Sequence, residues 1–373
     1  MDKTRLEAIH CFPIKGLPAI SLTNTDLVIG RGIPNDRRYA ITNGTMSDGK
    51  WMPAGNYFVN AYNDGLLNFK VTNDEQTSSI SISNPENQEI RIQTNNPQSL
   101  ELANLTLERF ISHIKVKADR TPPQIVELSD AGGSWDYPGT EISLINQMTV
   151  KAIGDAMDRD LDPERFRGNL ILSGLNAWQE FDLLGKKLGI GDAEIEVLFP
   201  IVRCPAPGVN PKTGLRDIDF EQEFPTCFGH AYCGMYARVT KTGKINAEDK
   251  IEVLGNASTP LARVQELADP YPLWPRFADV GSYDVNGETT QIALNCSSPW
   301  PFPDAKPGQR LRFHLNSTTK ATGWTSAYLD GVSNGQYHLS IPKSETGDPL
   351  TEYLRTELGA ETRLLISGPF GRV

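Results

Sequence analysis

The sequence contains few cysteines, and no two of them form the C-x-x-C pair that many metal and redox motifs contain. Five cysteines occur in 373 residues, and no two form C-x-x-C. Small secreted domains that depend on disulfides are far richer in cysteine and usually hold an even number. We therefore expect no disulfide framework, and we predict a reducing compartment, the cytoplasm.

Positive charge and long apolar runs are also scarce. The 46 acidic residues outnumber the 36 basic ones, for a formal net charge of −10. This balance argues against the broad cationic face that nucleic acid or an anionic membrane requires. No apolar run approaches the roughly 20 residues that span a bilayer, and the N-terminus lacks the apolar core of a signal peptide. The sequence predicts no nucleic-acid partner, no membrane partner and an unexported chain whose anion sites are local.

The length exceeds what one hydrophobic core usually serves, because domains cluster near about 100–150 residues. Short runs with two-residue alternation dominate, among them LEAIHCFPI, SSISISN and EIRIQTN, and most end at Gly, Pro or Asn. These patterns favour strands over long helices. We predict a mainly β protein with some α, divided into three units that span residues 1–115, 116–256 and 257–373.

Helical periodicity is confined to a few segments. Residues 99–114 and 143–158 are the longer candidates, and residues 349–358 form a short one. The strand, KTGK and strand pattern within residues 235–254 predicts a β hairpin. Residues 257–284 are rich in proline and aromatic side chains, which favours a linker or the entrance to a barrel.

A single cysteine stands at the head of a stiff loop, PIVRCPAPGVNPKTG, residues 200–214. Arg203 precedes Cys204, and three prolines and two glycines follow it. A thiolate beside an arginine in a polar loop is a good soft ligand or nucleophile, whereas most free cysteines are buried small hydrophobes. The residue type alone leaves both interpretations open.

The neighbouring motifs resemble the MOSC family, the molybdenum-cofactor sulfurase C-terminal-like domains that include the amidoxime-reducing component proteins. The resemblance covers most of residues 1–256. It rests on IHCFPIKGL, GRGIPNDRRYAIT, DPERFRGNLILSG, RCPAPGVNPKTGLRD and GKINAEDKIEVL, in that order along the chain. The last motif has Glu248 where glycine is common. The resemblance implies a MOSC N-terminal β-barrel-like domain followed by a MOSC β-barrel domain.

The resemblance also implies a cofactor and its ligands. In relatives that bind the molybdenum cofactor, the cysteine is a sulfur ligand of molybdenum, while lysine and arginine segments hold the pterin and its phosphate. Carried over to this sequence, Cys204 is the metal ligand and catalytic residue. One thiolate suits this role, because the two dithiolene sulfurs of the pterin supply the rest of a soft sulfur set. The implied cofactor-binding residues are Lys15, Gly16, Arg37, Arg167, Asn169, Arg203 and Asn210.

The implied residues differ in how well their chemistry fits. The guanidinium forks of Arg37 and Arg167 suit a phosphate. Asn169 and Asn210 are able to bond pterin edges, but asparagine in a turn or before proline often bonds its own backbone. For Arg38 and Arg165 we predict surface or strand-pairing cations instead.

Two functions follow from the resemblance. The first is a molybdenum-cofactor-dependent oxidoreductase, which reduces N-hydroxylated or N-oxygenated small molecules with electrons from a separate donor protein. In this function the cofactor brings the redox chemistry and the protein binds and positions it. The alternative is a carrier that binds or hands on molybdenum cofactor or sulfur without turnover. We favour the oxidoreductase.

A rival metal site deserves comparison. Cys227, His230 and Cys233 form C-x-x-H-x-x-C, which contains zinc-ligand residue types at compact spacing. The segment reads as an alternating strand, in which successive side chains point to opposite faces. We therefore favour a structural role over zinc. His230 has two further interpretations, a cap on the turn and a proton donor, of which we favour the cap.

The third unit resembles the FAD-binding barrel of ferredoxin-reductase-like flavoproteins. The resemblance rests on KPGQRLRFHL, YHLSIPK, GDPLTEYLRTEL and ISGPFGRV. The family's Arg-x-Tyr-Ser signature falls on GWTSAYLDG, where Thr325 and Ala327 replace the arginine and the tyrosine. We predict a ferredoxin-reductase-type β barrel that binds FAD weakly or not at all, so that electrons come from another protein.

Overall fold

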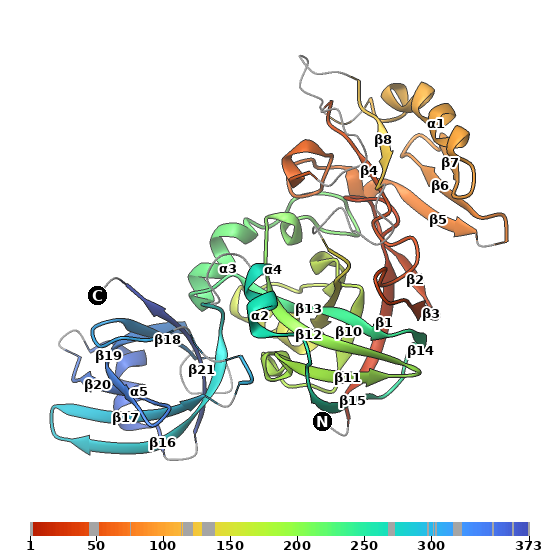
Figure 1. Ribbon diagram of the computed structural model, residues 1–373. Helices are drawn as coiled ribbons and strands as arrows, with labels where there is room; N and C mark the ends of the chain where they lie inside the picture. The colour runs from red at the N-terminus through yellow and green to blue at the C-terminus, as the bar shows by residue number, and fades with distance from the viewer. Residues whose placement is uncertain are drawn as a thin grey trace.

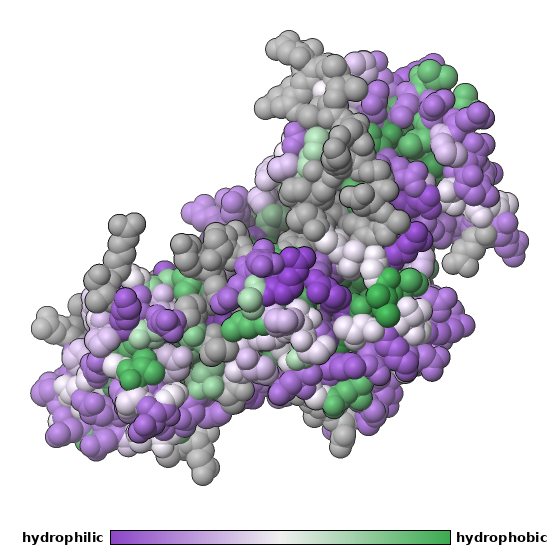
Figure 2. Space-filling model, in the orientation of Figure 1, coloured by the Kyte–Doolittle hydropathy of each residue, from purple (hydrophilic) through white to green (hydrophobic). Residues whose placement is uncertain are grey.

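The computed structural model is mainly β and arranges the chain as three packed regions (Figure 1). A small unit that contains α1 lies at one end, an eight-stranded sheet in the middle and a closed barrel at the other end. On the face shown in Figure 2, hydrophobic residues form separate patches among hydrophilic ones. The described residues are 3–44, 52–74, 76–112, 114, 122–128, 139–267, 273–296, 298–300, 302, 304–315, 323–344, 347–359 and 362–371. No helix among them has the length and apolar character needed to cross a bilayer.

The N-terminal unit packs one helix against short strands. Ile80 and Ile82 alternate along one strand and are fully buried. The helix α1 (Pro97–Phe110) begins at a cap, where the Asn96 side chain accepts a hydrogen bond from the Gln98 N–H at 3.1 Å. This confirms the predicted first helix. The strands are β4 (Tyr39–Ile41), β5 (Lys70–Asp74), β6 (Ser79–Ser83), β7 (Glu89–Gln93) and β8 (Ile125–Glu127), paired as β5-β6-β7 and β4-β8.

The central sheet has the strand order β15-β11-β12-β13-β9-β10-β1-β2, and its neighbours are antiparallel except for β9 and β10. Its first chain segment, β1, lies inside the sheet, so the N-terminal part of the chain helps to build the central region. The strands are β1 (Arg5–Cys11), β2 (Ile20–Leu22), β9 (Ile142–Asn146), β10 (Leu170–Ser173), β11 (Lys186–Ile190), β12 (Ala193–Val202), β13 (Tyr232–Lys241) and β15 (Ile251–Asn256). The unit boundaries drawn from the sequence stay a prediction.

Two predictions in this region are wrong. Residues 143–158 do not form one helix, because the chain runs as β9 to Asn146 and only then as α2 (Gln147–Ala156). The Asn146 side chain accepts a hydrogen bond from the Met148 N–H at 3.0 Å and so starts the helix there. The predicted hairpin also fails, since β14 (Gly243–Asn246) pairs with β3 (Asn24–Leu27) and not with β13. Gly243 passes so close to Asp192 that an added Cβ would lie 2.3 Å from its carbonyl carbon.

The C-terminal region is a closed antiparallel barrel with the strand order β16-β17-β20-β19-β18-β21. The short helix α5 (Pro349–Thr356) was predicted correctly. Residues 257–284 are more regular than predicted, because they contain α4 (Leu261–Leu267) and most of the first barrel strand. The barrel strands are β16 (Arg276–Asn286), β17 (Thr289–Cys296), β18 (Arg310–Leu315), β19 (Gly323–Ser333), β20 (Gln336–Pro342) and β21 (Arg363–Phe370).

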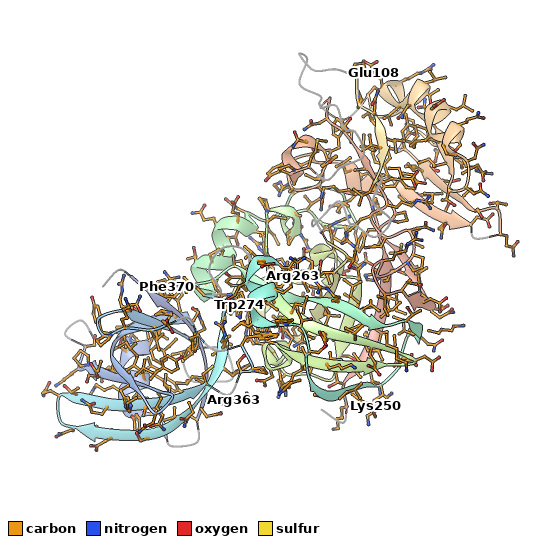
Figure 3. All side chains as sticks on the ribbon, in the orientation of Figure 1. Glu108, Lys250, Arg263, Trp274, Arg363 and Phe370 are labelled. Atoms are coloured by element: carbon orange, nitrogen blue, oxygen red, sulfur yellow. The ribbon has the colours of Figure 1, made fainter. Side chains whose placement is uncertain are left out.

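The barrel meets the central region through buried and charged contacts. Arg363, labelled in Figure 3, forms a two-pronged ion pair with Asp182. His314 bonds the Phe228 carbonyl oxygen through Nδ1 at 2.8 Å and the Ser367 hydroxyl through Nε2 at 2.7 Å. Its ring lies 4.7 Å from that of His230, centre to centre and perpendicular to it. Two buried imidazoles therefore face each other at this junction.

The junction should weaken in acid. Burial lowers the pKa of His314 to about 4 and holds the pKa of His230 well below its usual value. An unfolded histidine titrates near 6.5, so the unfolded chain binds more protons between pH 6.5 and 4. The contribution of His314 to the free energy of unfolding is fully present above pH 6.5. On the order of 3 kcal/mol of it is lost as the pH falls from 6.5 to 4. Urea unfolding at several pH values measures the loss.

The control for this prediction is His314→Gln, followed over the same pH range. Burial raises the pKa of Glu180 to about 7, which gives a pH dependence of the opposite sign in both proteins. The difference between the two proteins at each pH cancels that contribution. We expect the variant to be less stable at pH 7.5 and to depend less on pH. Parallel curves for the two proteins would contradict the prediction.

Candidate functional site

The candidate site is a cavity of about 250 Å³ between the N-terminal segments and the central sheet. Cationic side chains gather on its wall, although the protein as a whole is acidic. The cavity therefore gathers positive charge locally, as an anion site in an acidic protein requires. The ionisable side chains that line it are Lys15, Arg37, Tyr62, Glu141, Arg165, Arg167, Arg203, Cys204 and Tyr236.

Cys204 is exposed and lies two residues beyond the end of β12. The loop behind it is held closed, since the Asn210 N–H donates to the Leu215 carbonyl at 2.8 Å and the Asp217 N–H donates to the Gly208 carbonyl at 3.0 Å. The 3-10 helix η5 (Ala206–Gly208) stiffens its first turn. The prolines and glycines thus fix an accessible thiol on the cavity wall.

Arg37 and Arg167 converge on one aromatic ring. Each guanidinium carbon lies 4.4 Å from the centre of the Phe12 ring. Arg37 donates to the Arg167 carbonyl at 2.8 Å and to Asp36 at 2.6 Å. Both residues adopt left-handed backbone conformations, with φ of 48° and 52°. Non-glycine residues rarely do so, and such strain clusters at functional sites.

Lys15 and Gly16 occupy a tight turn on the same wall. The Lys15 side chain is buried, and its ammonium lies 5.8 Å from the centre of the Tyr57 ring. Gly16 has φ of +83°, and an added Cβ would lie 2.6 Å from the Phe58 carbonyl oxygen. Glycine is required at this position because no side chain fits, and the turn it allows places Lys15 at the cavity.

Asn169 lines the cavity, but its amide is already engaged. Its Oδ1 accepts from the Ser143 N–H at 3.1 Å, from the Ser143 hydroxyl at 2.9 Å and from Arg37 at 3.3 Å. Its Nδ2 donates to the His10 carbonyl at 3.1 Å. The arrangement suits a residue that orients Arg37 better than one that reads a ligand edge.

Two predicted residues remain, of which one lines the cavity and the other lies in the cysteine loop. Arg203 lines the cavity and donates to the Cys233 carbonyl at 2.7 Å and the Phe166 carbonyl at 2.8 Å. Asn210 is not part of the wall among the described residues. Its Nδ2 donates to Asp217 at 3.0 Å, and its Oδ1 accepts from the Lys212 N–H at 2.9 Å.

Two arginines were predicted to be surface or strand-pairing cations, and only one of them lies away from the cavity. Arg38 pairs with Glu127 and does not line the cavity. Arg165 does line it, but its guanidinium forms two 2.8 Å bonds to the Asp217 carboxylate. Because that fork is used within the protein, Arg165 braces the cysteine loop.

Other wall residues carried no sequence signal. Glu141 is the acidic side chain on the wall; its Oε1 pairs with Arg238 at 2.7 Å, and its buried Oε2 has no hydrogen-bond partner in the described part of the chain. Tyr236 lies opposite Ser143 across the β13–β9 pair. These residues meet only through strand pairing, so no local motif marks them.

The rival zinc motif is dispersed. Cys227 lies in α3 (Phe220–Phe228), so the strand predicted across it is wrong, and the helix ends at Gly229 with φ of 70°. Cys233 is fully buried in β13, which raises the pKa of its thiol to about 12. His230 accepts from the Tyr232 N–H at 3.1 Å and so caps the turn. No cluster of three or more His, Cys, Asp or Glu side chains in the described ranges is placed to hold a metal ion.

Two protein-family models match this chain. The MOSC N-terminal beta barrel domain matches residues 3–111, and the MOSC domain matches residues 136–252. Together they span more than half of the chain. The protein belongs to the MOSC family, as its motifs predicted. This family implies a molybdenum cofactor.

The mitochondrial amidoxime reducing component 2 of Rattus norvegicus is 28% identical over 130 residues, which are 31% of this chain and 37% of the rat protein. The YUAD protein from Bacillus subtilis aligns with 67% of this chain and 94% of its own at 13% identity and a TM-score of 0.31. The ferredoxin reductase in carbazole 1,9a-dioxygenase aligns with 50% of this chain and 46% of its own at 15% identity and a TM-score of 0.23. The predicted fold class, mainly β with two MOSC regions followed by a β barrel, is confirmed.

Proposed function

We propose that the protein is a molybdenum-cofactor-dependent oxidoreductase that reduces N-hydroxylated or N-oxygenated small molecules with electrons from a separate donor protein. The observation that carries this proposal is an exposed thiol, Cys204, on the wall of one cavity with Lys15, Arg37 and Arg167. The match to an amidoxime reducing component supports the choice of substrate class.

The wall residues fit the cofactor in chemical type. Cys204 offers a soft sulfur to the metal, while Lys15 and the two guanidinium groups bring the positive charge that suits a phosphate. Arg203 and Asn169 hold the wall by their bonds to Phe166 and Ser143. When bound, the cofactor supplies the two-electron chemistry. The residues of this chain bind it, orient it and keep a substrate pocket beside it.

The test is a metal analysis paired with a reduction assay. Protein purified from molybdate-supplied cells is assayed for molybdenum and for conversion of benzamidoxime to benzamidine with an artificial electron donor. The conversion takes up two electrons and two protons and releases water. Bound molybdenum with turnover supports the proposal. Bound molybdenum without turnover of any N-oxygenated probe would favour the carrier instead.

The barrel is proposed to bind FAD weakly or not at all. Thr325, where the flavin signature has arginine, bonds the Thr351 hydroxyl at 3.1 Å. The N-terminus of α5 is closed by the chain's own carboxylate, because Asp348 accepts from the Thr351 N–H at 3.0 Å. A phosphate at this helix end would meet that negative charge instead of free donors.

Of the cations near this position, Arg312 is engaged in other contacts. Arg312 stacks on Trp324 and Phe370 and donates to the Gly229 carbonyl at 2.8 Å, so it joins the barrel to the central region. Arg310 lies 6.0 Å from the Tyr328 ring centre. Lys320, the third candidate cation, lies outside the described residues.

We expect the purified protein to be free of flavin and to show no saturable quenching of FAD fluorescence at micromolar protein. The double variant Thr325→Arg, Ala327→Tyr restores the missing cation and ring, and its gain in affinity would locate the cause. Yellow protein that contains stoichiometric FAD would show this prediction to be wrong.

A further inference from the structure

One aromatic side chain that lines the cavity is largely exposed to solvent. Tyr62 lines the cavity and is 65% exposed, which is unusual for a large ring in a described part of the chain where most rings are buried. It sits in a turn in which the Tyr62 and Asn63 N–H groups both donate to the Val59 carbonyl, at 3.0 and 2.9 Å. The ring therefore offers an open flat face at the site.

The turn that carries Tyr62 is fixed to the cysteine loop. Arg216 donates to the Asn60 carbonyl at 2.8 Å and to the Ala61 carbonyl at 3.0 Å. Its other nitrogen, Nη1, donates to the Pro205 carbonyl at 2.9 Å, immediately after Cys204. One guanidinium thus joins the backbone beside the thiol to the backbone beside the tyrosine.

Close packing reinforces this connection. The Gly65 N–H donates to the Gly214 carbonyl at 3.3 Å. Gly214 has φ of +67°, and an added Cβ would lie 2.1 Å from the Asn68 side-chain oxygen. The loop and the turn therefore form one unit, and the backbone that carries the ring is held at a fixed place relative to the cysteine loop before any ligand binds.

We infer that Tyr62 is a specificity residue that stacks on the planar aromatic part of the substrate, and that Arg216 is the positioning residue that holds it there. The inference rests on the proposed function and names the substrate as an aromatic or heteroaromatic ring that bears the N-oxygenated group. The ring stacks on the exposed face of Tyr62, and its N-oxygenated end points toward the thiol-bearing part of the cavity.

The chemistry favours an aromatic ligand over other occupants. Stacked rings gain attraction beyond that of buried area alone, and a tyrosine side chain with only two torsions loses little conformational freedom on binding. A simple anion would instead select the buried cations. An aliphatic N-oxygenated compound fits the cavity but gains nothing from the ring.

The experiment compares benzamidoxime with acetamidoxime, which share the reacting group and differ in the ring. Purified full-length wild type, Tyr62→Ala, Tyr62→Phe and Arg216→Lys are tested by calorimetric or NMR titration for binding and by reduction for turnover. We expect wild type to bind benzamidoxime more tightly, by about 2- to 10-fold, which is the effect of one stacked pair. Tyr62→Ala should remove the difference by raising the KM for benzamidoxime, with kcat little changed.

The conservative variants separate stacking from general damage. Tyr62→Phe keeps the ring and should keep the preference. Arg216→Lys keeps the charge but loses the fork, so it should lower the preference in the same direction as Tyr62→Ala but less completely. An unchanged binding ratio in Tyr62→Ala would overturn the inference. Absence of turnover in wild type would overturn the proposed function alone, because the binding ratio is measured independently.

Discussion

Replacement of Cys204 with alanine is expected to abolish reduction of N-hydroxylated probes and to lower the molybdenum content of the purified protein. No other cysteine is positioned to take over, since Cys233 is fully buried and Cys227 lies in α3. The loss of turnover should exceed about 100-fold, because even residues that only support a metal ligand cost that much. Molybdenum-to-protein ratios and turnover are measured on the same preparations.

The matched control is Cys227→Ala, which removes a half-buried thiol away from the cavity. Its Sγ donates to the Ala156 carbonyl, at 3.8 Å. We expect this variant to keep metal and activity. A Cys204→Ala protein with the full metal content and rate of wild type would refute the assignment of the ligand.

Removal of charge at the cation cluster is expected to release the cofactor. Lys15→Met and Arg37→Met each delete a donor on the wall. Each lost charge-assisted contact costs about 1.5–3 kcal/mol, which corresponds to about 10- to 150-fold in affinity. Cofactor retained after gel filtration is quantified as molybdenum and as pterin fluorescence after oxidation. Arg37→Lys should fall between Arg37→Met and wild type, because it keeps the charge but not the fork.

Arg38→Gln provides the control for the cation cluster. Arg38 is adjacent to Arg37 in sequence, but it pairs with Glu127 away from the cavity. It should keep wild-type cofactor. Thermal unfolding of every variant separates loss of binding from loss of fold. Equal retention by Lys15→Met, Arg37→Met and Arg38→Gln would exclude the cluster as the phosphate site.

Local pattern sufficed for much of the fold. Alternation around Ile80 and Ile82 marks a strand, and the spacing of Ala103, Leu107 and Phe110 marks one face of α1. The local pattern failed where contacts between distant segments of the chain decide the secondary structure or the strand pairing. The run from Ser143 reads as the start of a helix, yet pairing with β10 and β13 makes its first residues a strand. Likewise β14 pairs with β3, more than 200 residues earlier in the chain, and no local signal announces that.

The candidate site, like the fold, could be predicted from the sequence only in part. Cys204, Lys15, Arg37 and Arg167 were predicted as site residues from motifs, and the structure gathers all four around one cavity. Their roles stay predictions. The motif match also proposed Asn210, whose amide is instead engaged within its own loop. Arg216 was noticed only as part of the cysteine-loop motif, because its contacts to the turn span 155 residues, and Tyr62 was not predicted, because only its exposure marks it.

The most direct test of the central claim is the sulfur environment of the metal in the wild-type protein and in Cys204→Ser, measured by molybdenum K-edge X-ray absorption. Serine keeps an oxygen at the same place, so metal retained by the variant remains measurable. We predict that the variant loses one sulfur neighbour relative to wild type and gains a lighter one. The same sulfur shell in both proteins would contradict the assignment of Cys204 as a molybdenum ligand.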